Sequence, residues 1–414
     1  MKVALLTGGG DKPYALGMAS ALTACGIEVE FIGSDELRTP ELLANRRVRF
    51  LNLRGDQKRN ASTGRKISRV LLYYLRLLKY AVTARPRLFH LLWNNKFEVF
   101  DRTFLMLFYR AAGRKLALTV HNVNAGERDG NDSWRNRISL RIQYHLADHL
   151  FVHTERMKKE LHGGFSVPEK KVSVIPFGIN NTVPNTALSS TEAKRRIRVE
   201  AADKTLLFFG NIAPYKGLEH LVSAFIQLVR SDTSYRLIIA GRLKGADDYW
   251  RQILQTIEEY GVTARTIQRI EYISDEETEV FFKAADLLIL PYTHVFQSGV
   301  LFLGYSFGLP ALATDVGSLK EEIVPGETGF LAAPGDATSL ATAIRQYFES
   351  ELYRKLEERR GIIRNYANER YSWSRVAAVT TGVYAELLGT SSSWEERQQS
   401  EKRMGSRSDR SLVI

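Results

Sequence analysis

Cysteine and long hydrophobic runs are what the sequence has least of. Cys25 is the single cysteine among 414 residues, so no disulfide can form within the chain, and nothing points to an oxidising compartment. No stretch approaches the roughly 18–20 apolar residues that a membrane-spanning helix needs. The first apolar run, Val3 to Thr7, is too short for the core of a signal peptide. These absences lead us to expect a cytoplasmic protein.

Internal repeats are also missing, and low complexity is confined to the end of the chain. Residues 391–414 are polar and of mixed charge, and we expect them to be disordered. The composition as a whole, with 44% hydrophobic and 25% charged residues, is ordinary for a globular protein. One hydrophobic core rarely serves a chain of 414 residues, so two domains are expected.

Acidic residues are in deficit. The chain has 46 Asp and Glu against 58 Lys and Arg, which gives a formal net charge of +12. That excess favours an anionic partner, and phosphate-bearing substrates, acidic membrane lipid and nucleic acid all fit its sign. No known nucleic-acid-binding motif accompanies the charge, so we do not expect nucleic acid as a partner.

Short apolar segments typical of buried strands alternate with helical segments along most of the chain. The strand-like segments are 3–6, 29–32, 88–93, 116–120, 149–152, 172–175, 206–210, 237–241, 267–270, 287–291 and 311–314, and the main helical ones are 13–24, 100–112 and 373–388. Strands separated by helices form parallel β-α-β units with both sheet faces covered. A polar stretch with Pro184 interrupts the alternation once.

This pattern predicts an α/β fold with two Rossmann-like, doubly wound domains that face a central cleft. We expect the first domain to comprise residues 1–180 together with the helix at 373–388, and the second to comprise residues 200–372. Residues 181–199 are expected to be the linker. Because open parallel sheets bind ligands at the carboxyl ends of their strands, the chemistry should lie in loops that follow strands.

The loop after the first strand is Gly8-Gly9-Gly10, which lets backbone N–H groups approach an anion. It is not the Gly-x-Gly-x-x-Gly fingerprint of dinucleotide binding, because Pro13 stands where the last glycine would be. The alternative is a tight turn between strand and helix that binds nothing.

Two loops of the second half are candidates for phosphate binding. Lys216, in the loop after the strand at 206–210, is a point charge suited to a diphosphate, although it could also be a surface lysine in a turn. Gln297 to Leu301 is typical of a helix start with Ser298 as its N-cap. Gly299 and Val300 would then direct N–H groups toward a phosphate; the alternative is an ordinary capped helix.

Two sets of histidines need an interpretation. His121 ends the strand at 116–120, where it could hydrogen-bond a sugar hydroxyl, help to polarise a leaving group, or serve a structural role. His145, His149 and His153 have a spacing of four that suggests a metal site. The residues between the last two are typical of a strand, so the three would not share a helical face, and we expect no metal.

A basic segment runs from Gly64 to Arg87. On a helix, its cations lie on one side, opposite three leucines: Arg65, Arg69, Arg76 and Lys79 against Leu71, Leu75 and Leu78. Two interpretations remain open. The helix could lie in the interface of an anionic membrane, or its basic side could be a solvated face over the domain core.

Taken in order, these segments resemble the retaining glycosyltransferases of family 4. The matching residues are Val120-His121-Asn122 at a strand end, Val174 to Ile179 as an Ile-Pro-x-Gly segment, Gly210 to Gly217 as Gly-Arg-x4-Lys-Gly, Phe307 to Pro310 as a Gly-x-Pro turn, Val316-Gly317 with Glu321, Gly326 to Phe330, and the helix after Trp373. The resemblance covers most of the ordered chain.

The resemblance implies the GT-B fold and transfer of a sugar, with retained configuration, to a glycan or lipid-linked acceptor in polysaccharide or glycolipid biosynthesis. The nucleotide-diphosphate sugar would bind mainly to the second half and the acceptor to the first, without a metal or other cofactor. The implied roles are leaving-diphosphate stabilisation by Lys216, Gly299 and Val300, donor-sugar contact by His121, further donor contacts by Ser298 and Leu301, and a reaction-centre loop at Gly9 and Gly10.

The chain departs from the family pattern at two places. Asn211 replaces the arginine before the lysine, and Arg242 or Lys244 is our candidate to compensate. The two glutamates of the family's Glu-x7-Glu motif fall on Val295 and Leu303, so another group must bind the ribose.

Glu321 is our candidate for that ribose contact. Two alternatives follow from the missing glutamates: a catalytically silent GT-B protein that serves as a binding or assembly partner, and a GT-B nucleotide-sugar epimerase.

Overall fold

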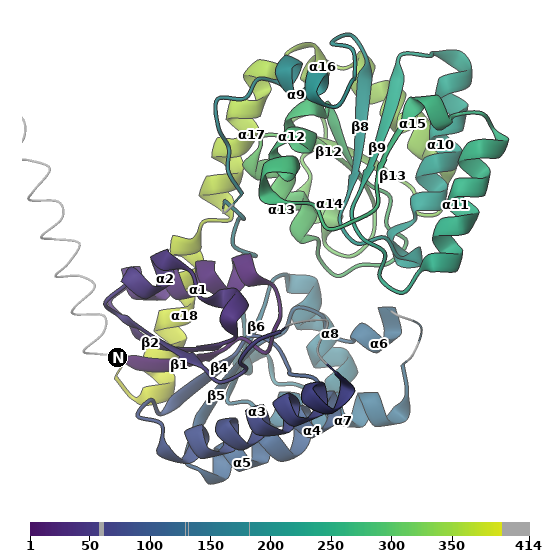
Figure 1. The fold of residues 1–414 in the computed structure, drawn as a ribbon. Helices are drawn as coiled ribbons and strands as arrows, with labels where there is room; N and C mark the ends of the chain where they lie inside the picture. The colour runs from purple at the N-terminus through teal and green to yellow at the C-terminus, as the bar shows by residue number, and fades with distance from the viewer. Residues whose placement is uncertain (58–61, 129, 131, 182, 391–414) are drawn as a thin grey trace, which may run out of the picture. The chain divides into compact units, whose positions relative to one another are not determined.

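The computed structural model describes residues 1–57, 62–128, 130, 132–181 and 183–390 (Figure 1). The tail expected to be disordered, residues 391–414, lies outside these residues. The described residues form two compact units: those of 1–124, 132–178 and 373–390 make the first, and those of 179–372 together with 125–128 and 130 make the second. Each unit is built on its own parallel sheet.

The first sheet has seven parallel strands in the order β3-β2-β1-β4-β5-β6-β7. The strands are β1 (Lys2–Leu6), β2 (Glu28–Gly33), β3 (Val48–Asn52), β4 (Leu88–Leu91), β5 (Lys115–Thr119), β6 (His149–Val152) and β7 (Val172–Val174). The central strands β1, β4 and β6 are almost fully buried, as expected for a sheet covered on both faces.

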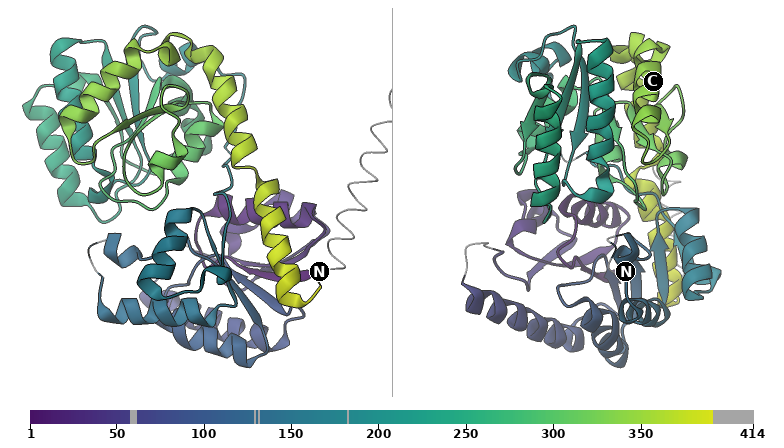
Figure 2. Two further views of the ribbon diagram at one scale, coloured as in Figure 1. Left: turned by 180° about the vertical axis from the view of Figure 1, so that it is seen from behind. Right: turned by 90° about the vertical axis from the view of Figure 1, so that its right-hand side faces the viewer.

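Helices cover both faces of this sheet (Figure 2). They are α1 (Lys12–Ala24), α2 (Pro40–Ala44), α3 (Thr63–Thr83), α4 (Glu98–Phe100), α5 (Met106–Ala111), α7 (Trp134–Leu146), α8 (Glu155–Phe165) and α18 (Trp373–Leu388), while α6 (Ala125–Arg128) follows β5 in the chain. The helix expected over 100–112 begins with a π-helical turn at Asp101–Leu105, which buries Asp101 and Arg102.

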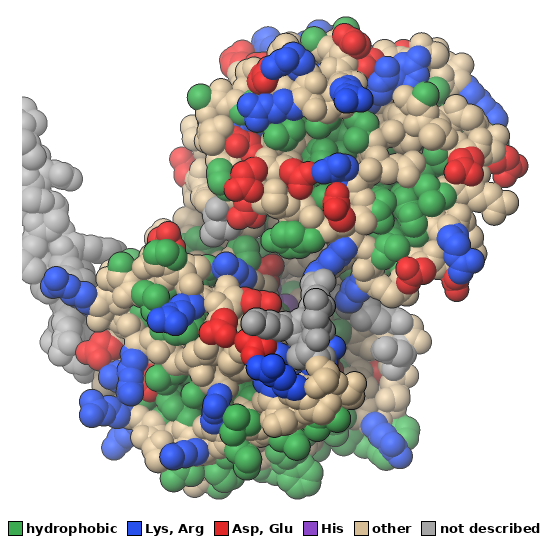
Figure 3. Space-filling view, in the orientation of Figure 1, with side chains coloured by type: hydrophobic (Ala, Val, Ile, Leu, Met, Phe, Trp, Pro, Cys, Tyr) green, Lys and Arg blue, Asp and Glu red, His purple; other side chains and the backbone are tan. Residues whose placement is uncertain are grey.

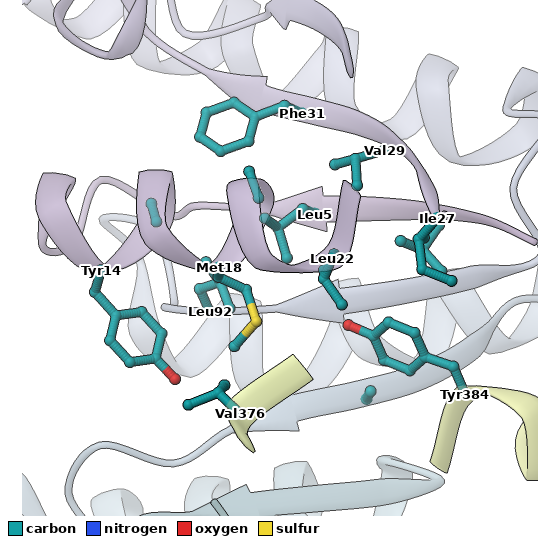
Figure 4. Packing of buried hydrophobic residues seen from close by; sticks show 14 of the residues in the cluster. Leu5, Tyr14, Met18, Leu22, Ile27, Val29, Phe31, Leu92, Val376 and Tyr384 are labelled. Carbon is teal, nitrogen blue, oxygen red and sulfur yellow. The ribbon is translucent and has the colours of Figure 1, made fainter. Parts of the chain in front are cut away.

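The core of the first unit joins the two ends of the chain. Tyr14 and Met18 of α1 pack with Val376 and Tyr384 of α18 over the β1 side chains (Figure 4). The last helix, expected from its apolar spacing over 373–388, is therefore part of this core. Its first residue, Trp373, lies so close to α1 that a Cβ added to Gly17 would be 2.3 Å from the indole ring.

The second sheet has six parallel strands in the order β10-β9-β8-β11-β12-β13. They are β8 (Lys204–Phe209), β9 (Tyr235–Ala240), β10 (Thr266–Arg269), β11 (Leu287–Leu290), β12 (Ala311–Thr314) and β13 (Gly329–Ala332). The helices around them are α9 (Ser190–Arg196), α10 (Leu218–Ser231), α11 (Asp247–Glu259), α12 (Asp275–Ala284), α13 (Gly299–Ser306), α14 (Leu319–Glu322), α15 (Ala337–Glu349), α16 (Glu351–Arg354) and α17 (Leu356–Arg370).

The doubly wound, two-unit architecture is confirmed, with two strands added to those predicted. β3 was missed because it is an edge strand with no fully buried residue, in which Arg49 and Asn52 are exposed. β13 was missed because it is short and begins at Gly329. The segment expected to link the domains contributes α9 to the second unit, where buried Lys194 donates to Asp286 at 2.9 Å.

Candidate functional site

In both sheets the strand order reverses between two central neighbours. The reversal lies between β1 and β4 in the first unit and between β8 and β11 in the second. Helices leave opposite faces of the sheet at such a point, so the loops at the carboxyl ends of the two strands separate and can hold a ligand. Of the predicted site residues, Gly9 and Gly10 follow β1, Asn211 and Lys216 follow β8, and Ser298 to Leu301 follow β11, whereas His121, Arg242 and Glu321 follow β5, β9 and β12.

In the first unit, the glycine loop after β1 packs against Trp93 after β4. Gly8 and Gly9 have positive φ values of 57° and 86°. A Cβ on Gly8 would lie 2.1 Å from the Trp93 carbonyl oxygen, and one on Gly10 would lie 1.9 Å from the indole. Glycine is therefore required here by close approach as well as by backbone conformation. The Gly10 amide donates to the Thr7 carbonyl at 3.1 Å, so it closes the turn and is not available to an anion.

His121 lies beside the same loop and is held by aromatic rings. Its imidazole stacks on Trp93 with ring centres 4.2 Å apart and planes within 4°. Tyr14 meets it edge-on at 4.8 Å. Its Nδ1 lies 3.0 Å from Nε2 of His153, which follows β6. The strand-end position predicted for His121 is thus the one observed, and its ring has a single orientation.

The hydrogen bonds of His153 determine the proton positions in this pair. His153 Nδ1 faces the Ile175 carbonyl oxygen at 3.3 Å, and a carbonyl only accepts, so Nδ1 carries the proton. The His153 Nε2 atom then accepts from His121 Nδ1–H, which leaves His121 Nε2 without a proton. Burial lowers the pKa of His153 to about 4 and that of His121 well below 6.5, with the neighbouring His153 as the second cause for His121. Both rings are neutral at pH 7.

Nε2 of His121 is a buried atom with no hydrogen-bond partner among the residues that the structure describes. In this tautomer it can accept a hydrogen bond from a hydroxyl group, which is the group that sugars offer in greatest number.

His145, His149 and His153, which are spaced four residues apart in the sequence, do not form a cluster. His149 lies in β6, as the strand interpretation required, and its Nε2 pairs with the Ser173 hydroxyl at 2.9 Å. His145 is at the end of α7, with Nδ1 2.9 Å from the Arg141 carbonyl. Within the described residues, no group of three His, Cys, Asp or Glu could hold a metal ion.

In the second unit, Lys216 and Ser298 meet through Tyr292. Lys216 Nζ donates to the Tyr292 hydroxyl at 2.6 Å, and that hydroxyl lies 3.2 Å from Ser298 Oγ. Lys216 follows β8 and the other two residues follow β11, so the contact joins the two loops of the strand-order reversal. All three side chains are buried. Lys216 is therefore not the surface lysine of the alternative interpretation.

The start of α13 differs from the prediction in one respect. Ser298 occupies the N-cap position, but its hydroxyl makes no capping bond and turns to Tyr292 instead. The Ser298 carbonyl accepts from Leu301 N at 3.2 Å. The amides of Gly299 and Val300 thus have no side-chain cap, and they remain at the positive end of the helix, where an anion is stabilised.

Asn211 lies beside Arg242, our candidate to compensate for the missing family arginine. Arg242 Nε donates to Asn211 Oδ1 at 3.2 Å, and Ile212 N donates to the Arg242 carbonyl at 2.9 Å. The two loops approach so closely that a Cβ on Gly241 would lie 1.8 Å from the Gly210 carbonyl oxygen. A guanidinium from the neighbouring loop therefore accompanies Asn211.

The positions of the family's two glutamates are apolar and buried. Val295 is 8% exposed and Leu303, on α13, is 7% exposed, so neither position offers an acceptor. Glu321, on α14, has an exposed side chain. The next residue, Glu322, is buried and accepts a hydrogen bond from the Tyr371 hydroxyl, so it is occupied within the unit.

α3 packs on its unit through residues that the sequence pattern did not select. Its buried side is formed by tyrosines with one leucine and one alanine: Tyr73, Tyr74, Leu77, Tyr80 and Ala81. Leu71 and Leu75, which were expected opposite the cations, are 56% and 63% exposed, so they do not cover the core. No helix in the described part of the chain is long and apolar enough to cross a membrane.

Sequence reasoning did not identify Tyr292, Trp93 or His153 as site residues. Each follows a strand directly or within two residues, which is the one local signal that could have selected them. Their partners lie in loops far away in the sequence, so the contacts themselves had no local signal.

Two protein-family models match successive parts of this chain. Residues 8–182 match the family described as Glycosyltransferase Family 4, and residues 203–350 match that described as Glycosyl transferases group 1. A D-inositol 3-phosphate glycosyltransferase of Corynebacterium urealyticum is 24% identical over 276 residues, 65% of this chain and 63% of that protein. The chain matches less than two thirds of the length of the first curated relatives.

Two solved structures illustrate the shared fold. A sucrose-phosphate synthase from Thermosynechococcus elongatus covers 94% of this chain and 99% of its own, with a TM-score of 0.75 and 18% identity. The HepE protein of Anabaena, in complex with UDP-glucose, covers 93% and 100%, with a TM-score of 0.72 and 17% identity.

Two parallel, doubly wound units of this kind define the GT-B class of glycosyltransferase folds. Within that class, the chain belongs to glycosyltransferase family 4.

Proposed function

We propose that the protein is a retaining glycosyltransferase that moves a sugar from a nucleoside diphosphate sugar to a glycan or lipid-linked acceptor. The second unit would bind the donor and the first unit the acceptor. No metal is needed in this proposal, because protein cations and helix amides take the role of stabilising the leaving diphosphate.

The observation on which the proposal rests is the chain Lys216–Tyr292–Ser298 at the start of α13. Negative charge grows on the diphosphate as the sugar leaves, and a fixed cation stabilises it more in the transition state than in the bound donor. Lys216, buried and held by Tyr292, is such a fixed cation. Gly299 and Val300 add two amides at the positive helix end, and Arg242 adds a second cation near Asn211.

The GT-B relatives support the type of donor. The HepE structure contains UDP-glucose, and we propose a nucleotide-sugar of the same kind for this chain. In the first unit, the unprotonated Nε2 of His121 would accept a hydrogen bond from a donor-sugar hydroxyl beside Gly9 and Gly10. Glu321 stays our candidate for the ribose contact, since Val295 and Leu303 cannot make it.

Turnover by the purified full chain with a panel of nucleotide-sugars and acceptors tests the proposal. Lys216→Ala should lower kcat/KM about a hundredfold, which is typical for loss of one group that stabilises developing negative charge. Lys216→Arg should retain part of that activity. Lys355→Ala is the matched control, because Lys355 is an exposed lysine of the same unit that pairs only with Glu351 in a surface ion pair.

The buried Val295 and Leu303 favour one alternative, a silent GT-B protein that assists a glycan pathway. Calorimetry separates it from the enzyme, since a silent protein would bind no nucleoside diphosphate. Conversion of a nucleotide-sugar in the absence of any acceptor would identify an epimerase instead. The transferase proposal fails if no donor of the panel is bound or consumed.

We also propose that the first unit attaches to anionic membrane from the cytoplasmic side. On α3, Ile67, Leu71, Leu75 and Val82 are all more than half exposed. Arg76 and Lys79 are exposed on the same helix. Exposed apolar residues flanked by cations are typical of a helix that lies in the membrane interface.

The apolar surface continues beyond α3. Tyr74 of α3 stacks on Phe97 with ring centres 5.5 Å apart, so the segment with α4 and α5 lies beside α3. The exposed apolar residues of that segment are Phe97, Val99, Phe100, Phe104 and Leu107. Figure 3 shows hydrophobic side chains gathered along the edge of the first unit where Figure 1 labels α3 and α4. Exposed patches of this extent usually mark an interaction surface.

A further inference from the structure

Arg54 is a cation of the first unit whose charge is not neutralised by a neighbouring acid. No acidic side chain of the described residues lies within ion-pair distance of its guanidinium, and none accepts a hydrogen bond from it. Its Nη1 atom is buried and has no hydrogen-bond partner among the residues of known placement. Burying a charged donor without a partner is costly, so such an atom is informative.

The position of Arg54 is at the ligand-binding edge of the sheet. The residue follows β3, and its amide donates to the Gly33 carbonyl at the end of β2, at 3.2 Å. The guanidinium reaches the loop after β1, where a Cβ added to Gly9 would lie 1.9 Å from Nη1. It also lies over the Tyr73 ring of α3, 5.5 Å from the centroid. The charge is thus held directly beside the glycine loop.

The charged residues around Arg54 leave the surroundings of its guanidinium positively charged. Asp56, the nearest acid in the chain, pairs with Arg69 at 2.8 Å. Asp35 accepts from the Asn52 amide at 2.5 Å. Arg76 donates to the Leu53 carbonyl at 3.4 Å, which brings a further cation to the residue before Arg54. The amide of Gly9 donates to no acceptor within the described residues, so a second donor accompanies the guanidinium.

We propose that Arg54 binds a phosphate group of the acceptor. A guanidinium presents two parallel N–H donors that match a phosphate, and Arg76 adds positive potential that favours the second negative charge of a phosphate over a singly charged carboxylate. This inference rests on the proposed function only where it assigns the phosphate to the acceptor. The phosphate site itself does not depend on the proposed function. Arg54 would select phosphorylated acceptors, either soluble or lipid-linked.

Binding of inorganic phosphate to the full chain, measured by calorimetry, tests the site. The Lys216→Ala background removes the main cation of the second unit, so that the measurement reports on the first. In that background, Arg54→Gln should weaken phosphate binding at least about tenfold, as expected for loss of a charge-assisted hydrogen bond. The phosphate affinity of Arg54→Lys should lie between that of the protein with Arg54 and that of Arg54→Gln, because lysine keeps the charge but lacks the two parallel N–H donors.

Arg85→Gln is the matched control. Arg85 is an exposed arginine of the same unit that precedes β4 and therefore lies at the opposite edge of the sheet. It should leave phosphate affinity unchanged. Thermal unfolding of each variant checks that the first unit is folded. Equal phosphate affinity of Arg54→Gln and Arg85→Gln, with both folded, would overturn the proposal.

Acceptor assays identify the source of the phosphate. Turnover of a soluble sugar phosphate and of a lipid-linked sugar diphosphate is each compared with turnover of the unphosphorylated sugar. The protein should prefer one of the phosphorylated acceptors, and Arg54→Gln should lose that preference. Sensitivity in either comparison supports the proposal, and insensitivity in both contradicts it. If no nucleoside diphosphate binds but Arg54→Gln still weakens phosphate binding, the transferase proposal fails and the phosphate site stands.

Discussion

Lys216 and Ser298 lie far apart in the sequence, with strands β9, β10 and β11 between them. The Tyr292 hydroxyl group nevertheless contacts both side chains. An ammonium can only donate, so the Tyr292 oxygen accepts from Lys216, while either hydroxyl can be the donor between Tyr292 and Ser298. Burial raises the pKa of Tyr292, so the phenol keeps its proton. The ammonium and the two hydroxyls form a hydrogen-bonded series at the start of α13.

Tyr292→Phe should disrupt this series without emptying the core. The ring remains, but Lys216 and Ser298 both lose a buried partner, which costs about 1–3 kcal/mol of stability. We expect the affinity for a nucleoside diphosphate to fall about tenfold, since both donors lose their fixed orientation. Calorimetry and urea unfolding measure the two effects. Tyr260→Phe, at an exposed tyrosine of the same unit, is the control and should change neither.

At the scale of elements, α18 depends on close contact with α1. Gly17→Ala would place a methyl group against the Trp373 ring, where the added Cβ has only 2.3 Å, and should destabilise the first unit by about 1–3 kcal/mol. Gly382→Ala lies within α18 with open space around its Cβ, so it should stabilise by about 0.5–1 kcal/mol through helix propensity. Urea midpoints compare the two. Equal effects of the same sign would show that α1 and α18 do not pack as described.

α3 is the element that sequence pattern described least well. The sequence pattern places its leucines opposite its cations, whereas the tyrosines of another side cover the core. A helix docked through tyrosines leaves both its leucines and its cations outward. This arrangement predicts binding to anionic vesicles that salt weakens, because the charge contribution is screened while the apolar contribution is not.

Leu75→Gln should therefore reduce partition onto anionic vesicles about tenfold, the cost of losing one buried leucine side chain. Ile362→Gln is the matched control, at an isoleucine of the second unit that is 48% exposed. Sedimentation with vesicles at low and high salt gives both results. Equal recovery on neutral and anionic vesicles, or no effect of Leu75→Gln, would contradict membrane attachment through α3.

At the scale of the whole molecule, the histidines are unevenly distributed between the two units. The first unit contains four whose pKa burial lowers: His90 to about 3, His149 and His153 to about 4, and His121 to well below 6.5. The second unit contains His220 and His294, both partly or fully exposed. Lowering the pH should therefore destabilise the first unit before the second.

The sign follows from proton binding in the two states. Unfolded histidines bind protons as the pH falls below about 6.5, while the folded ones do not until about 4, so stability is full above pH 6.5 and falls toward pH 4. A single shift such as that of His153 corresponds to about 3 kcal/mol. Asp101, whose pKa burial raises to about 6, acts in the opposite sense, since its protonation favours the folded state, and offsets about one histidine.

Urea unfolding between pH 7.5 and 4.5 measures this loss. Tryptophan fluorescence of a variant with Trp250→Phe and Trp394→Phe follows the first unit, because the remaining Trp93, Trp134 and Trp373 belong to it. His153→Gln should flatten the dependence on pH, and His145→Gln, at an exposed histidine, should leave it unchanged. A first unit that is equally stable at pH 4.5 and 7.5 would refute the expectation.

Much of the molecule was predictable because its signals are local. A buried strand needs a short apolar run, and the central strands of both sheets have one. The same holds for α18, whose bounds agree with its apolar spacing, and for the loops with Gly8 and Lys216. Hydrophobic burial acts on each segment separately, so each leaves its pattern in the sequence.

The sequence by itself therefore determined two parallel α/β units and the loops in which the candidate site lies. Only the tertiary structure decided which side chains meet there: Trp93 on His121, Tyr292 between Lys216 and Ser298, and Arg54 beside Gly9. It also decided that α3 docks through its tyrosines. The physical reason is that these contacts join loops or faces of distant segments, and such contacts depend on strand order and side-chain packing, neither of which has a local pattern.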